Sequence, residues 1–321
     1  MCGIIYVKHK KKSLSPASVL QRYERQRTRG IDGFGYVAVR DGMLVSEQRA
    51  TTEADIVAKV QAEDATELLF HHRLPTSTPN FVEATHPIVV DNPALRYRYY
   101  VVHNGIIANA EALRTRHEQA GFPYTTVIRK EWITQHATYY EHIFNDSEAL
   151  AVELARYLEG QTPTIAAEGS IACIAVQVDK STHRVRGLHY GRNEGSPLVV
   201  HDTPDFLSIT SEGERTHERV PAHVLRSYDY ERGVWRATAV QMGTYMPSYC
   251  SAGGSLWQSE NDFTYDDDNL LWELEEERAY YEAALREARV NGDWEQEQEL
   301  EAIVASLNES EDNINQYGFA F

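Results

Sequence analysis

The chain has 321 residues, of which 42% are hydrophobic and 25% are charged, so it can bury a sizeable core in one large domain or two. No run approaches the ~18 consecutive apolar residues of a membrane span, and the basic residues near the N-terminus follow an apolar stretch, the reverse of a secretory signal. The net charge of −17 argues against nucleic acid or an anionic membrane as the main partner. Three scattered cysteines make neither a disulfide framework nor a zinc site, and a cytoplasmic protein is expected.

Charge is distributed unevenly along the chain. Residues 251–321 hold 19 acidic and 3 basic residues, a net of −16, which leaves −1 for residues 1–250. We therefore predict a body over residues 2–245, a linker over 246–267, and an acidic helical hairpin with a tail over 268–321. The hairpin would bury a stripe of apolar residues, namely Leu270, Leu274, Tyr281, Leu285, Ile303 and Leu307.

Within the body, helical periodicity predicts helices over 16–29, 108–120 and 147–159, the last with Asp146 at its capping position. Segments rich in β-branched and aromatic residues predict strands over 2–9, 35–49, 66–73, 97–107, 169–191 and 196–212, with two more before residue 240. The helices fall between two groups of mostly antiparallel strands. This order favours an α+β layered body over a doubly wound sheet.

Cys2 would become the first residue if Met1 were removed. Its thiol and its own α-amino group would then share one residue. Because the α-amine has a pKa of ~7.7–8.0, against ~10.4 for lysine, it can accept the thiol proton near neutral pH. A chance Met-Cys start is the alternative.

Seven further segments follow Cys2-Gly3-Ile4 in a recognisable order. They are Arg29-Gly30-Ile31-Asp32-Gly33-Phe34-Gly35, the set His71, Arg73 and Thr76, His86-Pro87, His103 to Asn109 (HNGIIAN), Asp146-Ser147-Glu148, Gly195-Ser196-Pro197-Leu198, and Ser211-Glu212. Together they resemble the class II glutamine amidotransferases, whose glutaminase domain uses an N-terminal cysteine nucleophile. The resemblance covers about two-thirds of the chain. It implies a four-layer αββα sandwich, here with a C-terminal helical extension.

The resemblance also implies roles for the residues that react. Cys2 would attack the side-chain amide of glutamine, and Asn104 with the backbone N–H of Gly105 would hold the oxyanion. The alternative for Asn104-Gly105 is a two-residue hairpin turn, for which Asn-Gly is a strong signal.

Glutamine is a zwitterion, so its site needs a fixed cation and a fixed anion. Arg73, helped by Thr76, suits the α-carboxylate, because a guanidinium binds a carboxylate through two parallel hydrogen bonds. Asp146 suits the α-ammonium group, although capping of a helix is its alternative role. Arg29 and His86 are further predicted substrate-binding positions.

No metal and no cofactor is expected. His71 and His72 are neighbours in a predicted strand and would point to opposite faces, which is unsuited to a metal site. Cys173 lies in an apolar run and is predicted to belong to the core.

The sequence thus predicts a glutaminase that forms a γ-glutamyl thioester on Cys2 and releases glutamate and ammonia. The ammonia would serve a synthetase or transferase on another chain. One alternative is a stand-alone hydrolase of another γ-glutamyl amide, and another is a non-catalytic scaffold. The acidic hairpin would bind the acceptor enzyme or a second copy of this chain.

Overall fold

The computed structural model describes residues 2–74, 80–133, 138–213 and 217–243, together with isolated positions between 278 and 308; the backbone alone is described for 130–133 and 138–142. The predicted site residue Thr76 lies outside these ranges, as do all but Leu285 of the apolar positions assigned to the C-terminal stripe. The chain divides into two compact units, Met1–Ser251 and Ala252–Phe321. Across the described residues, no helix combines the length and apolar character needed to cross a membrane.

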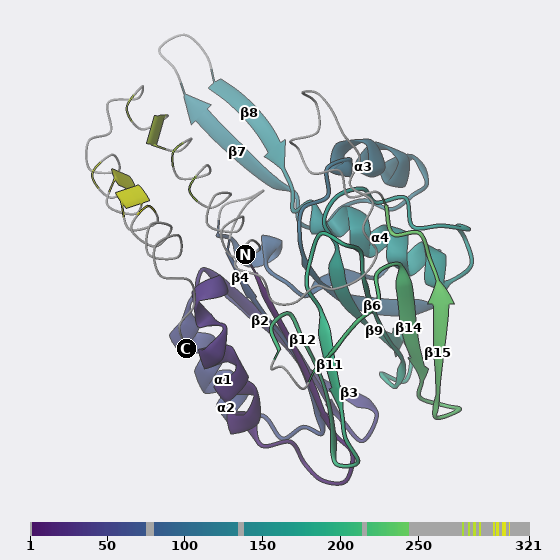
Figure 1. The fold of residues 1–321 in the computed structure, drawn as a ribbon. Helices are drawn as coiled ribbons and strands as arrows, with labels where there is room; N and C mark the ends of the chain where they lie inside the picture. Colours follow the sequence, from purple (N-terminus) through teal and green to yellow (C-terminus); the bar gives the residue numbers. More distant parts are fainter. Residues whose placement is uncertain are drawn as a thin grey trace, which may run out of the picture. The chain divides into compact units, whose positions relative to one another are not determined.

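The first unit contains two large antiparallel sheets (Figure 1). Along the seven-stranded sheet the order is β13 (Glu218–Arg219), β11 (Val199–Asp202), β12 (Phe206–Thr210), β1 (Gly3–His9), β4 (Glu67–Arg73), β2 (Gly33–Arg40) and β3 (Met43–Ala50). Along the six-stranded sheet it is β15 (Val234–Ala239), β14 (Val224–Asp229), β10 (Val185–Arg192), β9 (Ala172–Asp179), β6 (Tyr97–Asn104) and β5 (Ile88–Val90).

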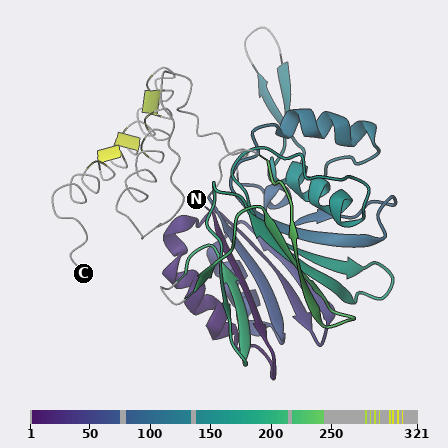
Figure 2. The same ribbon diagram turned by 45° about the vertical axis from the view of Figure 1, so that its right-hand side comes forward.

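Helices cover the outer face of each sheet, as Figures 1 and 2 show. The helices α1 (Pro16–Arg25) and α2 (Glu53–Ala62) pack on the seven-stranded sheet, and α3 (Ala110–Gln119) and α4 (Ser147–Leu158) on the six-stranded sheet. Three separate apolar cores result, one under each helix pair and one between the sheets. The predicted four-layer αββα sandwich is therefore confirmed.

Strand β1 shows how one sequence serves two cores. Ile5 and Val7 face the helices, whereas Ile4 and Tyr6 face the other sheet. Because side chains alternate across a strand, an uninterrupted apolar run fits a strand that is buried on both faces.

Helix α1 positions the segment that carries Arg29. Pro16 occupies its first turn, where a missing N–H costs nothing, and its inner face buries Val19 and Tyr23. The predicted helix over 16–29 in fact ends at Arg25, and a 3₁₀ turn (Arg27–Arg29) follows.

Helix α2 and the short strand β5 have no counterpart in the sequence prediction. Neither has the two-stranded hairpin of β7 (Ile128–Ile133) and β8 (Thr138–Ile143), which pairs with neither large sheet. The base of the hairpin is anchored to α4. The buried Glu148 carboxylate accepts hydrogen bonds from the N–H groups of Thr125 and Thr126, at 2.7 and 2.9 Å.

In the second unit, the described positions are helical. Arg278 Nη1 lies 3.4 Å from Asn308 Oδ1, and Arg289 pairs with Glu301. The two-helix hairpin over 268–321 stays a prediction.

Candidate active site

Cys2 precedes β1 and lies next to the end of β4. The register pairs Gly3 with His72, so the next residue back along the chain meets Arg73 and Leu74, and Cys2 Sγ lies 3.5 Å from the Leu74 carbonyl oxygen. Burial raises the pKa of the Cys2 thiol, against the opposing effects of the Leu74 hydrogen bond and the positive charges of Arg73 and Arg29. A thiol with a raised pKa is protonated at neutral pH and needs a base before it can attack.

Two predicted site residues converge on the backbone of Cys2. Asn104 Nδ2 donates a hydrogen bond of 2.6 Å to the Cys2 carbonyl, and Arg29 Nε donates one of 3.1 Å to the same oxygen. Asn104 is the last residue of β6 in the six-stranded sheet, whereas Cys2 borders the seven-stranded sheet. The site therefore lies where the ends of the two sheets meet.

Ser211 links the start of β1 to the turn that carries Arg29. Its hydroxyl accepts a hydrogen bond from the Ile4 N–H at 3.0 Å and donates one to Gln26 Oε1 at 2.8 Å. The Gln26 carbonyl in turn accepts the N–H of Arg29 at 3.0 Å. Ser211 closed the run of motifs in the sequence, and these contacts give it a physical role.

The HNGIIAN segment does not form a hairpin turn. After Asn104 the chain passes Gly105, makes a bridge at Ile107 with Gly169, and enters α3, so the hairpin alternative is wrong. The buried His103 side chain fixes the end of β6 through two hydrogen bonds. Its Nε2–H donates to the Ser170 carbonyl at 3.0 Å, and its Nδ1 accepts from the hydroxyl of Ser147 at 2.9 Å.

Asp146 stands at the N-cap position of α4 but does not cap it. Its side chain makes no capping hydrogen bond, and its Oδ2 accepts the N–H of Ile107 at 2.7 Å. The capping alternative is therefore wrong, because the carboxylate is directed to the loop beside Gly105.

Arg73 lies among acidic groups at the end of β4. It is 3% exposed, and burial lowers its pKa, while the nearby charges of Cys2, Asp146 and Asp32 raise it. A buried guanidinium with carboxylates close by is a fixed positive charge suited to an anion. The structure thus brings Cys2, Arg29, Arg73, Asn104, Gly105 and Asp146 into one region.

His86 lies next to His71, with ring centroids 4.1 Å apart and the rings tilted by 34°. Burial lowers the pKa of both imidazoles well below the usual range, so both are neutral at pH 7. His72 points the other way, toward the Tyr23 ring at 5.0 Å, which confirms that His71 and His72 face opposite sides. Within the described ranges, no cluster of His, Cys, Asp or Glu could hold a metal ion.

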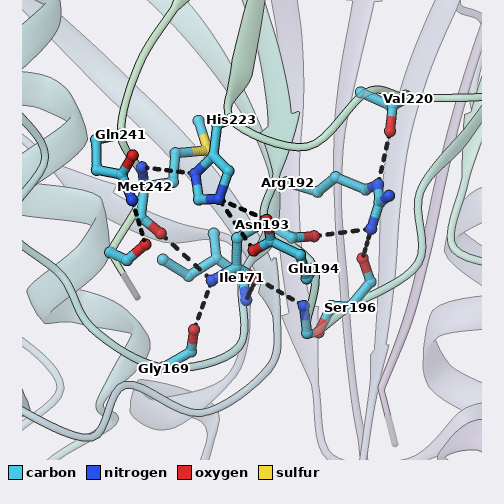
Figure 3. A network of polar contacts seen from close by, with 12 residues as sticks. Gly169, Ile171, Arg192, Asn193, Glu194, Ser196, Val220, His223, Gln241 and Met242 are labelled. Atoms are coloured by element: carbon cyan, nitrogen blue, oxygen red, sulfur yellow. Dashed lines mark hydrogen bonds and ion pairs between the residues drawn. The ribbon is translucent and has the colours of Figure 1, made fainter. Parts of the chain in front are cut away.

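The segment around the G-S-P-L motif forms a network of polar contacts (Figure 3). Arg192 Nε donates to the Val220 carbonyl at 2.6 Å, and Arg192 Nη1 donates to the Ser196 carbonyl at 3.2 Å. Next to it, the His223 ring bonds to Glu194 at 2.8 Å. Hydrogen bonds to nearby residues thus fix the loop that carries this motif.

Sequence reasoning missed Gln26, Ser170 and Asn193, whose hydrogen bonds fix the segments next to the site residues. Each is an ordinary polar residue without a local motif, and its role depends on contacts that are distant in the sequence. The core prediction for Cys173 is confirmed, since it is fully buried in β9 and burial raises its pKa to about 12.

Two surface cavities, of about 440 and 730 Å³, lie elsewhere. The smaller opens between β10, β11, β12, β14 and β15, and the larger is bounded by residues 8–13 and 184–186. Neither is lined by Cys2.

No family model matches the chain. Two glutamine–fructose-6-phosphate aminotransferases (isomerizing) match it, that of Corynebacterium glutamicum at 26% identity over 71% of this chain and that of Staphylococcus epidermidis at 26% over 68%. The solved glutamine phosphoribosylpyrophosphate amidotransferase of B. subtilis superposes with a TM-score of 0.52 at 15% identity, covering 75% of this chain and 50% of that one. A second solved structure, titled as the allosteric regulatory enzyme of purine biosynthesis, superposes with a TM-score of 0.54.

The chain therefore resembles the class II glutamine amidotransferases in sequence and in fold. Its αββα sandwich matches the fold of the two solved structures. The chain spans 38% and 35% of the length of the two aminotransferases that it matches.

Proposed function

We propose that the chain hydrolyses the side-chain amide of glutamine, with Cys2 as the nucleophile after Met1 has been removed. The observation that carries the proposal is the convergence of Asn104 and Arg29 on the carbonyl of Cys2. Asn104 is 102 residues away in the sequence and ends a strand of the other large sheet, so this contact joins the two sheets at Cys2.

The chemistry needs a base, because burial raises the pKa of the Cys2 thiol. The freed α-amino group of Cys2, with a pKa of ~7.7–8.0, takes the thiol proton as sulfur attacks the amide carbon. The proton then passes to the leaving nitrogen, and ammonia departs from a γ-glutamyl thioester. Water adds to the thioester carbon, glutamate leaves, and the thiol is restored.

The oxyanion of each tetrahedral intermediate would be received by Asn104 and by the N–H of Gly105. The Asn104 amide has two N–H groups, and one of them already donates to the carbonyl of Cys2. A donor fixed beside the attacking residue needs little reorganisation when the charge develops.

Substrate selection would use the charges beside the thiol. Arg73 would bind the α-carboxylate of glutamine and Asp146 its α-ammonium group, with Thr76, His86 and Arg29 as further contacts. The mutual electrostatic influence of Arg73, Cys2 and Asp146 supports this assignment, because it requires the three groups to be close together.

Glutamate and ammonia release from glutamine tests the proposal. Full activity is expected only for protein whose intact mass shows loss of Met1, and Cys2→Ala should abolish it. A panel of γ-glutamyl conjugates should be cleaved more slowly than glutamine. A Cys2→Ala protein that still releases ammonia, or much faster cleavage of a conjugate, would contradict the proposal.

We further propose that the ammonia is delivered to a separate acceptor enzyme, bound through the acidic C-terminal residues. A net charge of −16 over residues 251–321 would attract a basic surface, and such binding should weaken as salt is raised. A cognate acceptor should raise glutamine hydrolysis and take up ¹⁵N from amide-labelled glutamine. A salt-sensitive dimer without an acceptor, measured by light scattering, would instead assign these residues to a second copy.

A further inference from the structure

The side chain of Asn193 uses its full hydrogen-bonding capacity inside the protein (Figure 3). Its Nδ2 donates to the carbonyls of Gly169 at 2.6 Å and Met242 at 3.3 Å, and its Oδ1 accepts the N–H groups of Ile171 at 2.8 Å and Gly195 at 3.0 Å. A carboxamide has two donors and two acceptor positions, and here all four are occupied. Asn193 is fully buried, so its amide fixes the segment 169–171 from one side.

The other side of this segment touches Gly105. Gly105 has a φ of +134°, and a Cβ there would lie 1.9 Å from the Ser170 carbonyl oxygen. The contact is reciprocal, since a Cβ on Gly169, with φ of +127°, would lie 2.0 Å from the Ile106 carbonyl oxygen. Neither backbone can carry a side chain here, and neither can move toward the other.

Hydrogen bonds between Ser170 and Ile106 stabilise the same contact. Ser170 Oγ accepts the N–H of Ile106 at 3.0 Å, and the Ser170 N–H donates to the Ile106 carbonyl at 3.1 Å. The peptide that follows Gly105 therefore takes its position from the segment 169–171, and that segment takes its position from Asn193.

We propose that Asn193 is a positioning residue for the oxyanion hole, acting through Ser170 on the backbone of Gly105. The inference rests on the proposed function, in which the Gly105 N–H receives the developing oxyanion. Stabilisation of that charge needs a donor at 2.7–3.1 Å from the oxyanion, so a small displacement of the Gly105 backbone, which carries its N–H with it, weakens catalysis more than substrate binding.

Asn193→Asp tests this with little change of shape. The carboxylate keeps both acceptors for Ile171 and Gly195 but loses both donors, and it opposes the carbonyl oxygens of Gly169 and Met242. We expect kcat for glutamine to fall at least about tenfold, below the 10²–10³-fold loss of removing an oxyanion donor outright, with KM changed less than about threefold.

An aldehyde analogue separates positioning from a general loss of structure. Glutamate γ-semialdehyde adds the Cys2 thiol to its carbonyl and forms a tetrahedral thiohemiacetal whose oxygen occupies the oxyanion position. Its inhibition constant should rise in Asn193→Asp by about the same factor as kcat falls. Loss of folded protein alone would lower the active fraction and leave both the inhibition constant and KM unchanged.

Ser170→Ala is the second variant, because it removes only the acceptor of the Ile106 N–H. It should lower kcat in the same direction, and the double variant should lose less than the product of the two single losses, since both act on one contact. If Asn193→Asp does not fold, the kcat and inhibition constant of Ser170→Ala decide alone. Glu194→Gln is the control, as it alters the neighbouring surface pair with His223 and should leave kcat within about twofold.

The outcomes separate the two proposals. If the wild type hydrolyses glutamine and Cys2→Ala does not, unchanged kcat and aldehyde inhibition in both Asn193→Asp and Ser170→Ala overturn the inference alone. If the wild type releases no ammonia, or Cys2→Ala remains fully active, the proposed function fails and the inference fails with it.

Discussion

The two ends of strand β1 differ in how many of their buried polar atoms have hydrogen-bond partners. At the carboxyl end, the buried Glu67 carboxylate accepts hydrogen bonds from the Tyr6 hydroxyl at 2.7 Å and from Tyr230, and it pairs with Lys8 at 3.0 Å. Each charge there meets a partner. The Lys8 ammonium also lies 4.2 Å from the centre of the Tyr230 ring, which adds a cation–π contact.

At the amino end, beside Cys2, the buried polar atoms are not matched in this way. Ten buried side-chain nitrogen or oxygen atoms lack a hydrogen-bond partner within the described part of the chain, and half of them belong to His71, His72, His86 and Asn104. The carboxyl end has two, His9 Nδ1 and Ser208 Oγ. A buried polar atom without a partner is costly, and native proteins keep such atoms where function needs them. The comparison assigns stability to the Glu67 end and binding capacity to the Cys2 end.

The assignment of function to the Cys2 end would be contradicted most strongly if Asn104 could be removed without loss of activity. Asn104→Ala should lower kcat about 10²–10³-fold, equivalent to ~2.7–4 kcal/mol of transition-state stabilisation, since it deletes a donor beside the thiol. Steady-state glutaminase kinetics measure this. The same change at Asn92, whose amide bonds to the Gly121 carbonyl and the Ala94 N–H among the described residues, should leave kcat unaltered. Equal losses in the two variants would count against the assignment.

Glu67→Ala should show the reverse behaviour, with a stability loss and intact chemistry. It leaves Tyr6, Tyr230 and Lys8 without their acceptor, and breaking a buried ion pair on one side costs about 3 kcal/mol. Urea unfolding should show that loss while kcat stays within about twofold. Lys10→Gln is the control, because its pair with Asp202 is exposed and worth less than ~1 kcal/mol. A large fall in kcat for Glu67→Ala would show that the Glu67 end also contributes to activity, against the assignment.

The sequence predicted the layers of the sandwich because both faces of the inner strands are buried. In β9, for example, Ile174 faces the other sheet and Cys173 faces the helices, so the whole run is apolar and easily recognised. The hairpin β7–β8 was not predicted, because it belongs to neither large sheet and shows no such run. Helix α2 was missed because only Ile56 and Val60 anchor it, too few for a clear helical period.

The site divides in the same manner. Cys2, Arg73 and Asn104 stand in ordered motifs, and the structure brings them together. The direction of the Asp146 side chain was not readable, since a carboxylate before a helix fits capping equally well, and the contact with Ile107 that decides it spans 39 residues. The residues that hold the site were invisible for the same reason. The Gln26 side chain, for instance, bonds to a hydroxyl that lies 185 residues away.

Acid should destabilise the protein through histidines in both sheets. Burial lowers the pKa of His72 and of His189 to about 4, whereas an unfolded histidine has ~6.5. The unfolded chain therefore binds more protons between these values, so stability is complete above pH ~6.5 and is lost as pH falls toward about 4. By pH 5 the loss should be about 2 kcal/mol for each histidine, and urea midpoints measured from pH 4.5 to 7.5 would show it. His72→Gln and His189→Gln should each flatten that slope. An unchanged slope in both would mean that other groups take up the protons.

The smallest expected effect concerns Ser211, which holds the cysteine end together without touching substrate. Ser211→Ala leaves the Ile4 N–H and Gln26 Oε1 unpaired, which should cost about 1 kcal/mol of stability. It should also lower kcat severalfold, because Gln26 supports the turn from which Arg29 reaches the Cys2 carbonyl. Ser208 offers a nearby control in β12, the strand that ends just before Ser211, as it is 1% exposed and its hydroxyl has no partner in the described chain. Ser208→Ala removes a buried hydroxyl that makes no hydrogen bond, so its urea midpoint should be equal to or above that of the wild type and its kcat should be unchanged. If the two serine variants behave alike, the hydrogen bonds of Ser211 contribute neither to stability nor to activity at the Cys2 end of β1.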